Sequence, residues 1–190
     1  EGSHINETVR SIELDYRSYT LLDGPEDDPS GSNRYTKLQY PRIKKISDKE
    51  YIMFWQNGKL GTNLYWAKSS DLIHWGPSNI LIQAQNLPEI NDKRYFVNCD
   101  GEVLQNGDIL AVFSYRANAG YSNRPEQCGI MLMRSTDKGE TWSAPHTIYI
   151  GQNWEQHILQ LSSGEIQVAF THIATGIYED GFSSLLSSGV

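Results

Sequence analysis

The sequence predicts an all-β protein built from repeated four-stranded sheets, the architecture of a β-propeller. The first observation is a repeat: three segments share the order strand, four-residue turn, apolar strand. The apolar residues before the turns are Ile46, Leu104 and Leu161, which lie 58 (104 − 46) and 57 (161 − 104) residues apart. The second observation is a composition with eleven Tyr and five Trp, residues that favour β-structure. Four strands in each repeat of this length correspond to one propeller blade.

The first 39 residues precede the repeats. Apolar residues alternate with polar ones over residues 9–22, which indicates one or two extended strands. Residues 23–33 are rich in Asp, Pro, Gly and Ser and are predicted to form a surface loop. We expect the N-terminal strand to close the propeller ring against its last blade.

The predicted blades cover residues 40–97, 98–154 and 155–190. The first two strands of each are predicted at 40–46 and 51–55, at 98–104 and 109–113, and at 155–161 and 166–170. Third strands are predicted at 63–68 and 129–134, and a fourth at 146–150. No helix is predicted.

The chain therefore holds about two and a half blades, whereas a closed ring needs at least four. The third blade would leave an open sheet edge, which is unfavourable in an isolated monomer. We expect the remainder of the propeller to lie outside this chain or to come from a second chain.

Residues 135–142, S-T-D-K-G-E-T-W, carry the most specific motif. Asp137 can accept backbone N–H groups of a tight turn, Gly139 can adopt φ > 0, and Trp142 can fold under the turn as an apolar plug. The motif resembles the Asp box of the sialidase (BNR-repeat) superfamily. The resemblance implies a six-bladed propeller in which this turn joins the third and fourth strands of a blade, far from any active site. Residues 69–75 look like a shortened version of the turn that lacks the Gly.

Charge and hydropathy exclude several partners. The net charge of −7 argues against nucleic acid and anionic membranes. No apolar run approaches the roughly 18 residues of a membrane span, so no membrane insertion is expected. No signal peptide is visible, and the family resemblance implies a secreted or periplasmic protein. Cys99 and Cys128 lack metal-type spacing and are consistent with one disulfide or two free thiols.

The blade register predicts where chemistry would occur. The early residues of the innermost strands lie at the channel rim, and these are Tyr40 with Arg42, Asn98 with Asp100, and Glu155 with His157. The members of each pair are two apart, so they face the same side of a strand. Three neighbouring blades thus offer polar side chains where a plain sheet core would carry Val or Leu.

Two of these positions lie in motifs with a family likeness. Residues 40–43, Y-P-R-I, resemble the opening inner-strand motif of sialidase-like glycosidases, which implies that Arg42 binds a substrate carboxylate. Guanidinium suits this role because it donates two parallel hydrogen bonds. The alternative is an ion pair between Arg42 and Asp100 across the channel.

Residues 154–155, W-E, followed by G-E-I-Q-V at 164–168, resemble exo-arabinanase-like members of glycoside hydrolase family 93. The resemblance implies that Glu155 is a catalytic carboxylate, although Gln156 stands where that family commonly has Pro. The alternative is a rim glutamate that binds a loop. Glycoside hydrolysis needs two carboxyl groups, and Asp100 is the candidate partner within this chain, with a purely structural aspartate as its alternative.

Two further features refine the prediction. Residues 56–63 lack the acid/base Asp of sialidases, so sialic acid is not the expected substrate. The predicted loop 115–125 should project over the channel mouth, where Tyr115 and Arg116 could form a sugar subsite; an ordinary solvent loop would have the same composition.

The sequence thus predicts an exo-acting glycoside hydrolase that removes terminal sugars from an oligo- or polysaccharide. The alternative is a non-catalytic carbohydrate- or protein-binding propeller. Neither function calls for a metal or another cofactor, and His74, His146 and His172 stand alone in the sequence.

Overall fold

The computed structural model describes residues 39–58, 62–119, 123–173 and 182–188. The strand expected at 9–22 and the loop at 23–33 lie outside these residues. The described chain is all-β, as predicted, and its helical elements are two short 3₁₀ turns, η1 (Pro88–Ile90) and η2 (Pro125–Gln127). Among the described residues, no helix has the length and apolar character that a membrane crossing requires.

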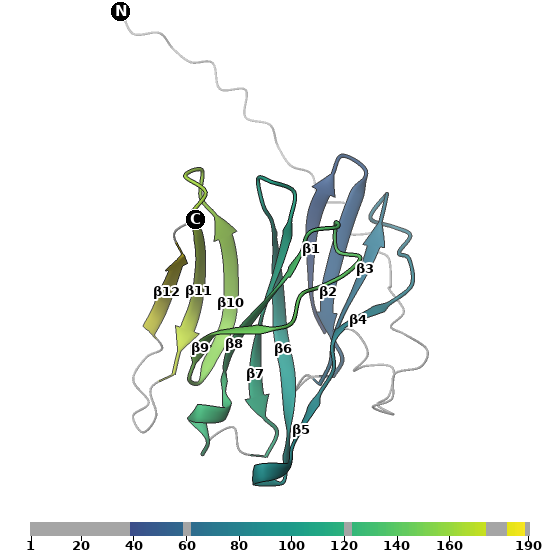
Figure 1. The fold of residues 1–190 in the computed structure, drawn as a ribbon. Coiled ribbons are helices and arrows are strands. Elements are labelled where there is room, and N and C mark those ends of the chain that lie inside the picture. Colours follow the sequence, from purple (N-terminus) through teal and green to yellow (C-terminus); the bar gives the residue numbers. More distant parts are fainter. Residues whose placement is uncertain (1–38, 59–61, 120–122, 174–181, 189–190) are drawn as a thin grey trace, which may run out of the picture.

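Twelve strands form three antiparallel sheets (Figure 1). The first sheet contains β1 (Gln39–Ser47), β2 (Glu50–Gln56), β3 (Leu64–Ser69) and β4 (Asn79–Ile82). The second contains β5 (Gln85–Leu87), β6 (Asp92–Val103), β7 (Ile109–Ala117), β8 (Gly129–Ser135) and β9 (His146–Ile150). The third contains β10 (Asn153–Gln160), β11 (Ile166–His172) and β12 (Phe182–Ser188).

The repeated strand, turn and strand pattern pairs as predicted. Register pairs next to the turns are Ser47 with Glu50, Val103 with Ile109, and Gln160 with Ile166. The second sheet differs from the predicted four strands because β5 adds a fifth strand along the first residues of β6. This sheet therefore begins well before Asn98, and the predicted boundary at 97/98 falls inside β6.

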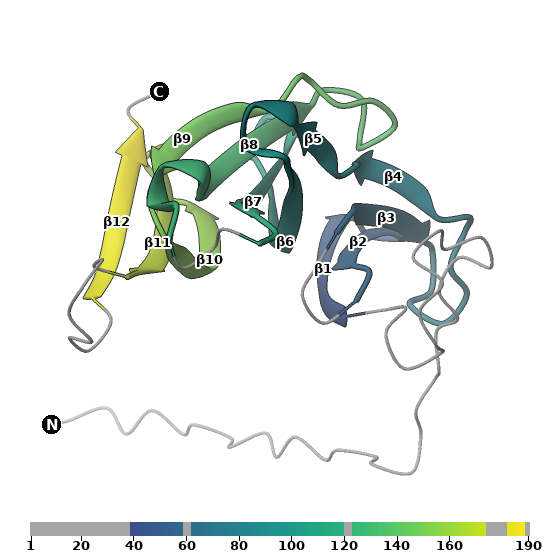
Figure 2. The same cartoon turned by 90° about the horizontal axis from the view of Figure 1, so that it is seen from below.

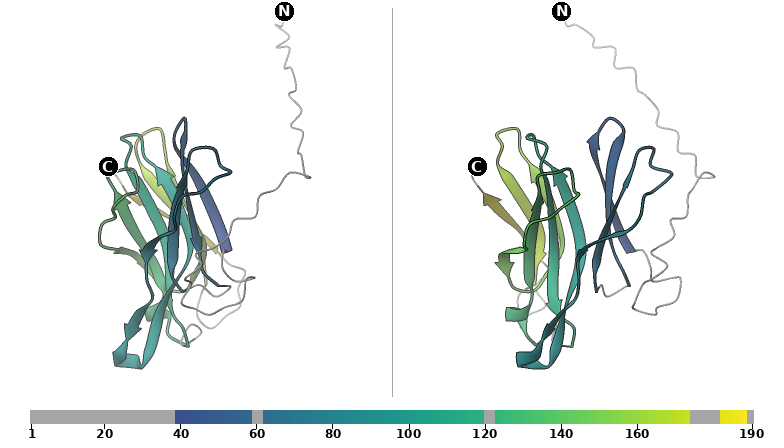
Figure 3. Two further views of the ribbon diagram at one scale, coloured as in Figure 1. Left: turned by 90° about the vertical axis from the view of Figure 1, so that its right-hand side faces the viewer. Right: turned by 45° about the vertical axis from the view of Figure 1, so that its right-hand side comes forward.

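The three sheets fan out side by side, with β6 in contact with both β1 and β10 (Figure 2). Strands β1, β6 and β10 lie on the inner side of this fan, and Figure 3 shows the sheets as separate twisted layers. One apolar layer, which includes Phe54, Phe96 and Trp142, joins the first two sheets. A second, with Val112 and Ile158, joins the second sheet to the third. The stacked layers hold the inner strands in fixed relative positions.

The turn at residues 135–142 is bonded as its sequence predicts. Asp137 Oδ1 accepts the Thr141 N–H at 2.9 Å, and Ser135 Oγ accepts the Gly139 N–H at 2.7 Å. Gly139 has φ +87°. The Trp142 ring meets Phe54 of the first sheet edge-on, with 5.7 Å between ring centroids. The turn therefore also fastens two sheets together.

The turn at residues 69–75 also uses an Asp carboxylate to accept backbone N–H groups, but it is shorter and has no glycine. Asp71 Oδ1 accepts the N–H groups of Ile73 and His74 at 2.9 and 2.7 Å. Leu72 takes φ 66°, close to the φ of 60° at Lys138 in the longer turn. Since Leu carries a Cβ, this left-handed residue is strained where Gly would not be.

Candidate functional site

A β-bulge interrupts each inner strand at the same point of the repeat. The register shifts occur between Gln39 and Arg42 in β1, between Val97 and Asp100 in β6, and between Trp154 and His157 in β10. The bulged residues Tyr40, Asn98 and Glu155 have φ values of 53°, 54° and 51°. Left-handed residues with a side chain are uncommon and cluster at functional sites. Because all three occur at the same point of the repeat, they are a regular feature of this fold and not a local irregularity.

The three bulges share one hollow. A depression of about 240 Å³ is lined by Tyr40, Asn98 and Glu155, together with Gln56, Val97, Arg116 and Trp154. A smaller recess beside it is lined by the same three bulged residues and by Arg42, Cys99 and Gln156. The structure thus brings together five of the residues predicted for the site: Tyr40, Arg42, Asn98, Arg116 and Glu155.

Charged groups of both signs surround this hollow. The Glu155 side chain is exposed, as are Tyr40 and Arg42, whereas Asn98 and Arg116 are half-buried. Arg42 donates Nη1 to the carbonyl of Pro41 at 3.1 Å. Two arginines and one glutamate therefore line the hollow and the recess beside it.

Asp100 lies outside the lining of the hollow, and its carboxylate interacts with three neighbouring residues. Its Oδ2 lies 2.7 Å from His157 Nδ1 and accepts the Ile158 N–H at 3.2 Å. Lys44 Nζ lies 3.3 Å from its Oδ1. The predicted alternative of an Arg42–Asp100 pair is wrong, because Lys44 takes that place. The His157 side chain is 64% exposed and that of Asp100 only 3%.

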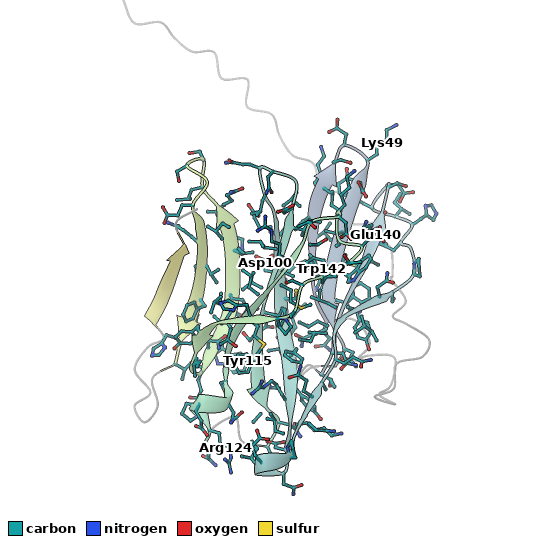
Figure 4. The ribbon with its side chains drawn as sticks, viewed as in Figure 1. Lys49, Asp100, Tyr115, Arg124, Glu140 and Trp142 are labelled. Carbon is teal, nitrogen blue, oxygen red and sulfur yellow. The ribbon has the colours of Figure 1, made fainter. Side chains whose placement is uncertain are left out.

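The region around Tyr115 differs from the prediction. Residues Tyr115, Arg116 and Ala117 continue β7 instead of starting a loop, and they pair with Phe96, Tyr95 and Arg94. Tyr115 is 4% exposed, and the Arg94 guanidinium lies 4.8 Å from the centre of its ring. Burial raises the pKa of its hydroxyl. Figure 4 shows Tyr115 on the second sheet, nearer than Asp100 to the end with η1 and η2. Its burial is incompatible with stacking on a sugar.

Five lining residues of the hollow and the recess were not among the predicted site residues: Gln56, Val97, Cys99, Trp154 and Gln156. Two of them carried a signal in the sequence. Gln56 ends the buried run of β2, in which the other side chains are apolar. A single polar side chain in such a run could have indicated that this end of the strand belongs to a site. Trp154 belongs to the W-E motif at 154–155, yet only its neighbour Glu155 was assigned a role.

The two cysteines are free and buried. The sequence left open whether Cys99 and Cys128 form a disulfide or stay as free thiols, and the structure has the free thiols. Within the part of the chain that the structure describes, no three His, Cys, Asp or Glu side chains gather in a way that could hold a metal ion.

The chain matches no protein-family model and no curated protein. Solved structures share its fold. An N-acetylgalactosamine deacetylase from F. plautii, in complex with blood group B trisaccharide, has a TM-score of 0.51 at 15% identity over 77% of this chain and 48% of that one. A polysaccharide lyase described as an ulvan lyase has a TM-score of 0.58 at 14% identity over 80% and 41%. The GH43 protein from Bacillus licheniformis has 0.54 at 17% identity over 77% and 31%.

These identities are low, so the likeness shows the fold alone, a β-propeller-like arrangement of sheets. The chain spans about half, or less, of the length of these three structures.

Proposed function

We propose that this chain forms part of an exo-acting glycoside hydrolase of the sialidase-like propeller group, with Glu155 as a catalytic carboxylate. The observation that carries the proposal is the set of three bulges in register, which direct Tyr40, Asn98 and Glu155 into one hollow. The fold likeness to structures of a glycan deacetylase, a polysaccharide lyase and a GH43 protein supports a carbohydrate substrate. A six-bladed ring and a secreted or periplasmic location belong to the same proposal.

The size and lining of the hollow fit one terminal sugar. Its volume of about 240 Å³ lies below the roughly 300–1,000 Å³ of sites for drug-sized ligands. Tyr40 and Trp154 offer aromatic faces for a sugar ring, and Asn98, Arg42 and Arg116 offer hydrogen-bond donors. In this proposal the hollow takes the terminal sugar of a chain.

Glycoside hydrolysis uses two carboxyl groups, one as the acid and the other as the nucleophile or base. Glu155 is the carboxylate of the hollow among the described lining residues. Asp100 is held by Lys44, His157 and the backbone of Ile158, which favours a structural role for it. In this proposal the second carboxyl comes from the remainder of the ring.

Glu155→Gln tests the assignment in the full-length protein. We expect the variant to lose hydrolysis of a panel of aryl glycosides and oligosaccharides while its thermal midpoint stays unchanged. Glu102→Gln is the matched control, since Glu102 lies on the neighbouring inner strand and accepts the Gln160 N–H at 3.1 Å. Unchanged turnover in Glu155→Gln would refute a catalytic role for Glu155.

Among the described residues that line the hollow, Glu155 is the single carboxylate, which also favours a second candidate, a propeller that binds carbohydrate or protein without catalysis. That function predicts glycan binding without released product and with no dependence on the ionisable group of Glu155. Measuring binding and product release in the same samples separates the two functions.

A further inference from the structure

We propose that Ser114 and Gln56 are positioning residues that hold the left-handed bulges of Glu155 and Asn98 in the geometry the hollow requires. The inference rests on the proposed function of that hollow. Both residues lie near the ends of second strands, Gln56 in β2 and Ser114 in β7, and each reaches the inner strand of the next sheet.

Ser114 contacts the chain on both sides of Glu155. Its Oγ lies 2.6 Å from Asn153 Oδ1 and 2.7 Å from Gln156 Oε1. Ser114, Asn153 and Gln156 are 3%, 3% and 5% exposed, so water does not compete for these bonds. The residues before and after the bulge are therefore fixed to β7, and the left-handed residue between them has little freedom.

The donors and acceptors around Ser114 can be assigned from their partners. Asn153 Nδ2 donates to the Gly151 carbonyl at 2.9 Å, so its Oδ1 is the acceptor for the single Ser114 proton. Ser114 Oγ can then accept a hydrogen bond from the Gln156 amide, turned so that its nitrogen faces the hydroxyl. That flip exchanges the 3.5 Å contact of Nε2 with the Val112 carbonyl, at the limit of a hydrogen bond, for the stronger bond to Ser114, and it leaves Oε1 facing that carbonyl without a donor.

Gln56 holds the preceding bulge in a similar way. Its Oε1 accepts the Asn98 N–H at 2.8 Å, and its Nε2 donates to the Gly58 carbonyl at 3.0 Å. Gln56 is 2% exposed. The spacing of Gln56 and Ser114 is 58 residues (114 − 56), in phase with the bulges at Asn98 and Glu155, which lie 57 apart (155 − 98).

Different side chains occupy these two equivalent positions of the repeat, but both can hold a left-handed bulge. A left-handed conformation is unfavourable for any residue with a Cβ, and it persists only where the surroundings hold it. Gln reaches a backbone N–H directly, whereas the shorter Ser acts through two amide side chains. The shared property is a buried polar group aimed at the next bulge.

The test compares Ser114→Ala with Ser114→Thr and with Ser135→Ala in isotope-labelled full-length protein. Ser135 is the matched control because it is 1% exposed and bonded through its hydroxyl, but it lies in the outer turn. Backbone carbon chemical shifts of Glu155 report whether its φ stays positive. We expect Ser114→Ala to move these shifts toward extended values, and Ser114→Thr and Ser135→Ala to leave them in place.

A kinetic readout accompanies the spectra, on a glycoside that the wild type hydrolyses. Ser114→Ala should lower kcat by about tenfold or more with a smaller change in KM, since small displacements of a catalytic group are costly. Ser114→Thr should restore kcat, and Ser135→Ala should keep it. Wild-type shifts of Glu155 in Ser114→Ala, or an equal loss of kcat in Ser135→Ala, would overturn the inference.

The two proposals fail in different ways. A wild type that hydrolyses no glycoside contradicts the proposed function, while the Glu155 shifts still decide the positioning role. If Ser114→Ala does not fold, Gln56→Leu applies the same test to the shifts of Asn98. Unchanged Asn98 shifts in Gln56→Leu would then count against the inference.

Discussion

His157 Nδ1 lies 2.7 Å from Asp100 Oδ2, across the junction between the second and third sheets. Lys44 of the first sheet lies 3.3 Å from the other oxygen of the same carboxylate. One buried side chain therefore links all three inner strands. A carboxylate that is 3% exposed is tolerated only because these partners replace its hydration.

Asp100→Ala should lower the free energy of unfolding by about 3 kcal/mol, because it removes the common partner of Lys44, His157 and the Ile158 N–H. Urea unfolding followed by tryptophan fluorescence measures the change. Asp48→Ala is the control, since Asp48 forms an exposed ion pair with Lys45 at 2.9 Å and its loss should leave the midpoint unchanged. Equal midpoints for the two variants would show that the Asp100 link does not stabilise the fold.

The inner strands could be predicted because the repeat fixes them independently of side-chain detail. The same register brings Tyr40, Asn98 and Glu155 to one hollow, but it also pointed to Asp100, which lies outside the lining. The bulges could not be predicted, since Tyr and Glu carry no signal for φ > 0. The sequence also could not choose between Arg42 and Lys44 as the partner of Asp100. They are two apart on one strand, and only the packing of β1 against β6 decides which ammonium or guanidinium group reaches the carboxylate.

Short strands and strand ends were missed for a related reason. The strand β5 has three residues, too few to show a period, and it forms only because the long strand β6 offers an unpaired edge. Tyr115 continues a strand because Phe96 pairs with it from β6. Tertiary pairing determined both features, and local sequence did not reveal it.

Gly139→Ala should destabilise the protein more than Gly107→Ala, although both residues have nearly the same φ, +87° and +89°. Each Ala would incur the left-handed cost of about 1–2 kcal/mol. A Cβ at Gly139 would also lie 2.9 Å from Ile52 Cδ1, whereas at Gly107 nothing lies within 4 Å. Ile52 is fully buried and has little room to move, so we expect at least about 1 kcal/mol more for Gly139→Ala. Thermal or urea unfolding of the two variants side by side gives the comparison, and equal losses would contradict the close packing of this turn on the first sheet.

The two cysteines should be unreactive in the folded protein. Burial raises the pKa of the Cys99 thiol well above its usual value, with the Asp100 carboxylate as a second cause, and it raises the pKa of Cys128 to about 11. Near neutral pH few thiolates form, and the thiol groups are also covered. Ellman's reagent should detect no thiol in the native protein and both after guanidinium chloride is added. Rapid reaction of the native protein would show that one of these sites opens.

Asp137 should make the stability of the protein sensitive to acid. Hydrogen bonds from the Thr141 hydroxyl, the Thr141 N–H and the Ser135 hydroxyl lower the pKa of its carboxyl from 3.8 to about 2 in the folded protein. Because the folded pKa lies below the unfolded one, the contribution of this carboxylate is fully present above the unfolded value. It is lost as the pH falls from there through the folded value. We therefore expect the difference in the free energy of unfolding between the wild type and Asp137→Asn to shrink across that interval and to stay constant at higher pH. Parallel pH profiles for the two proteins would mean that the bonds of this turn do not depend on the charge of Asp137.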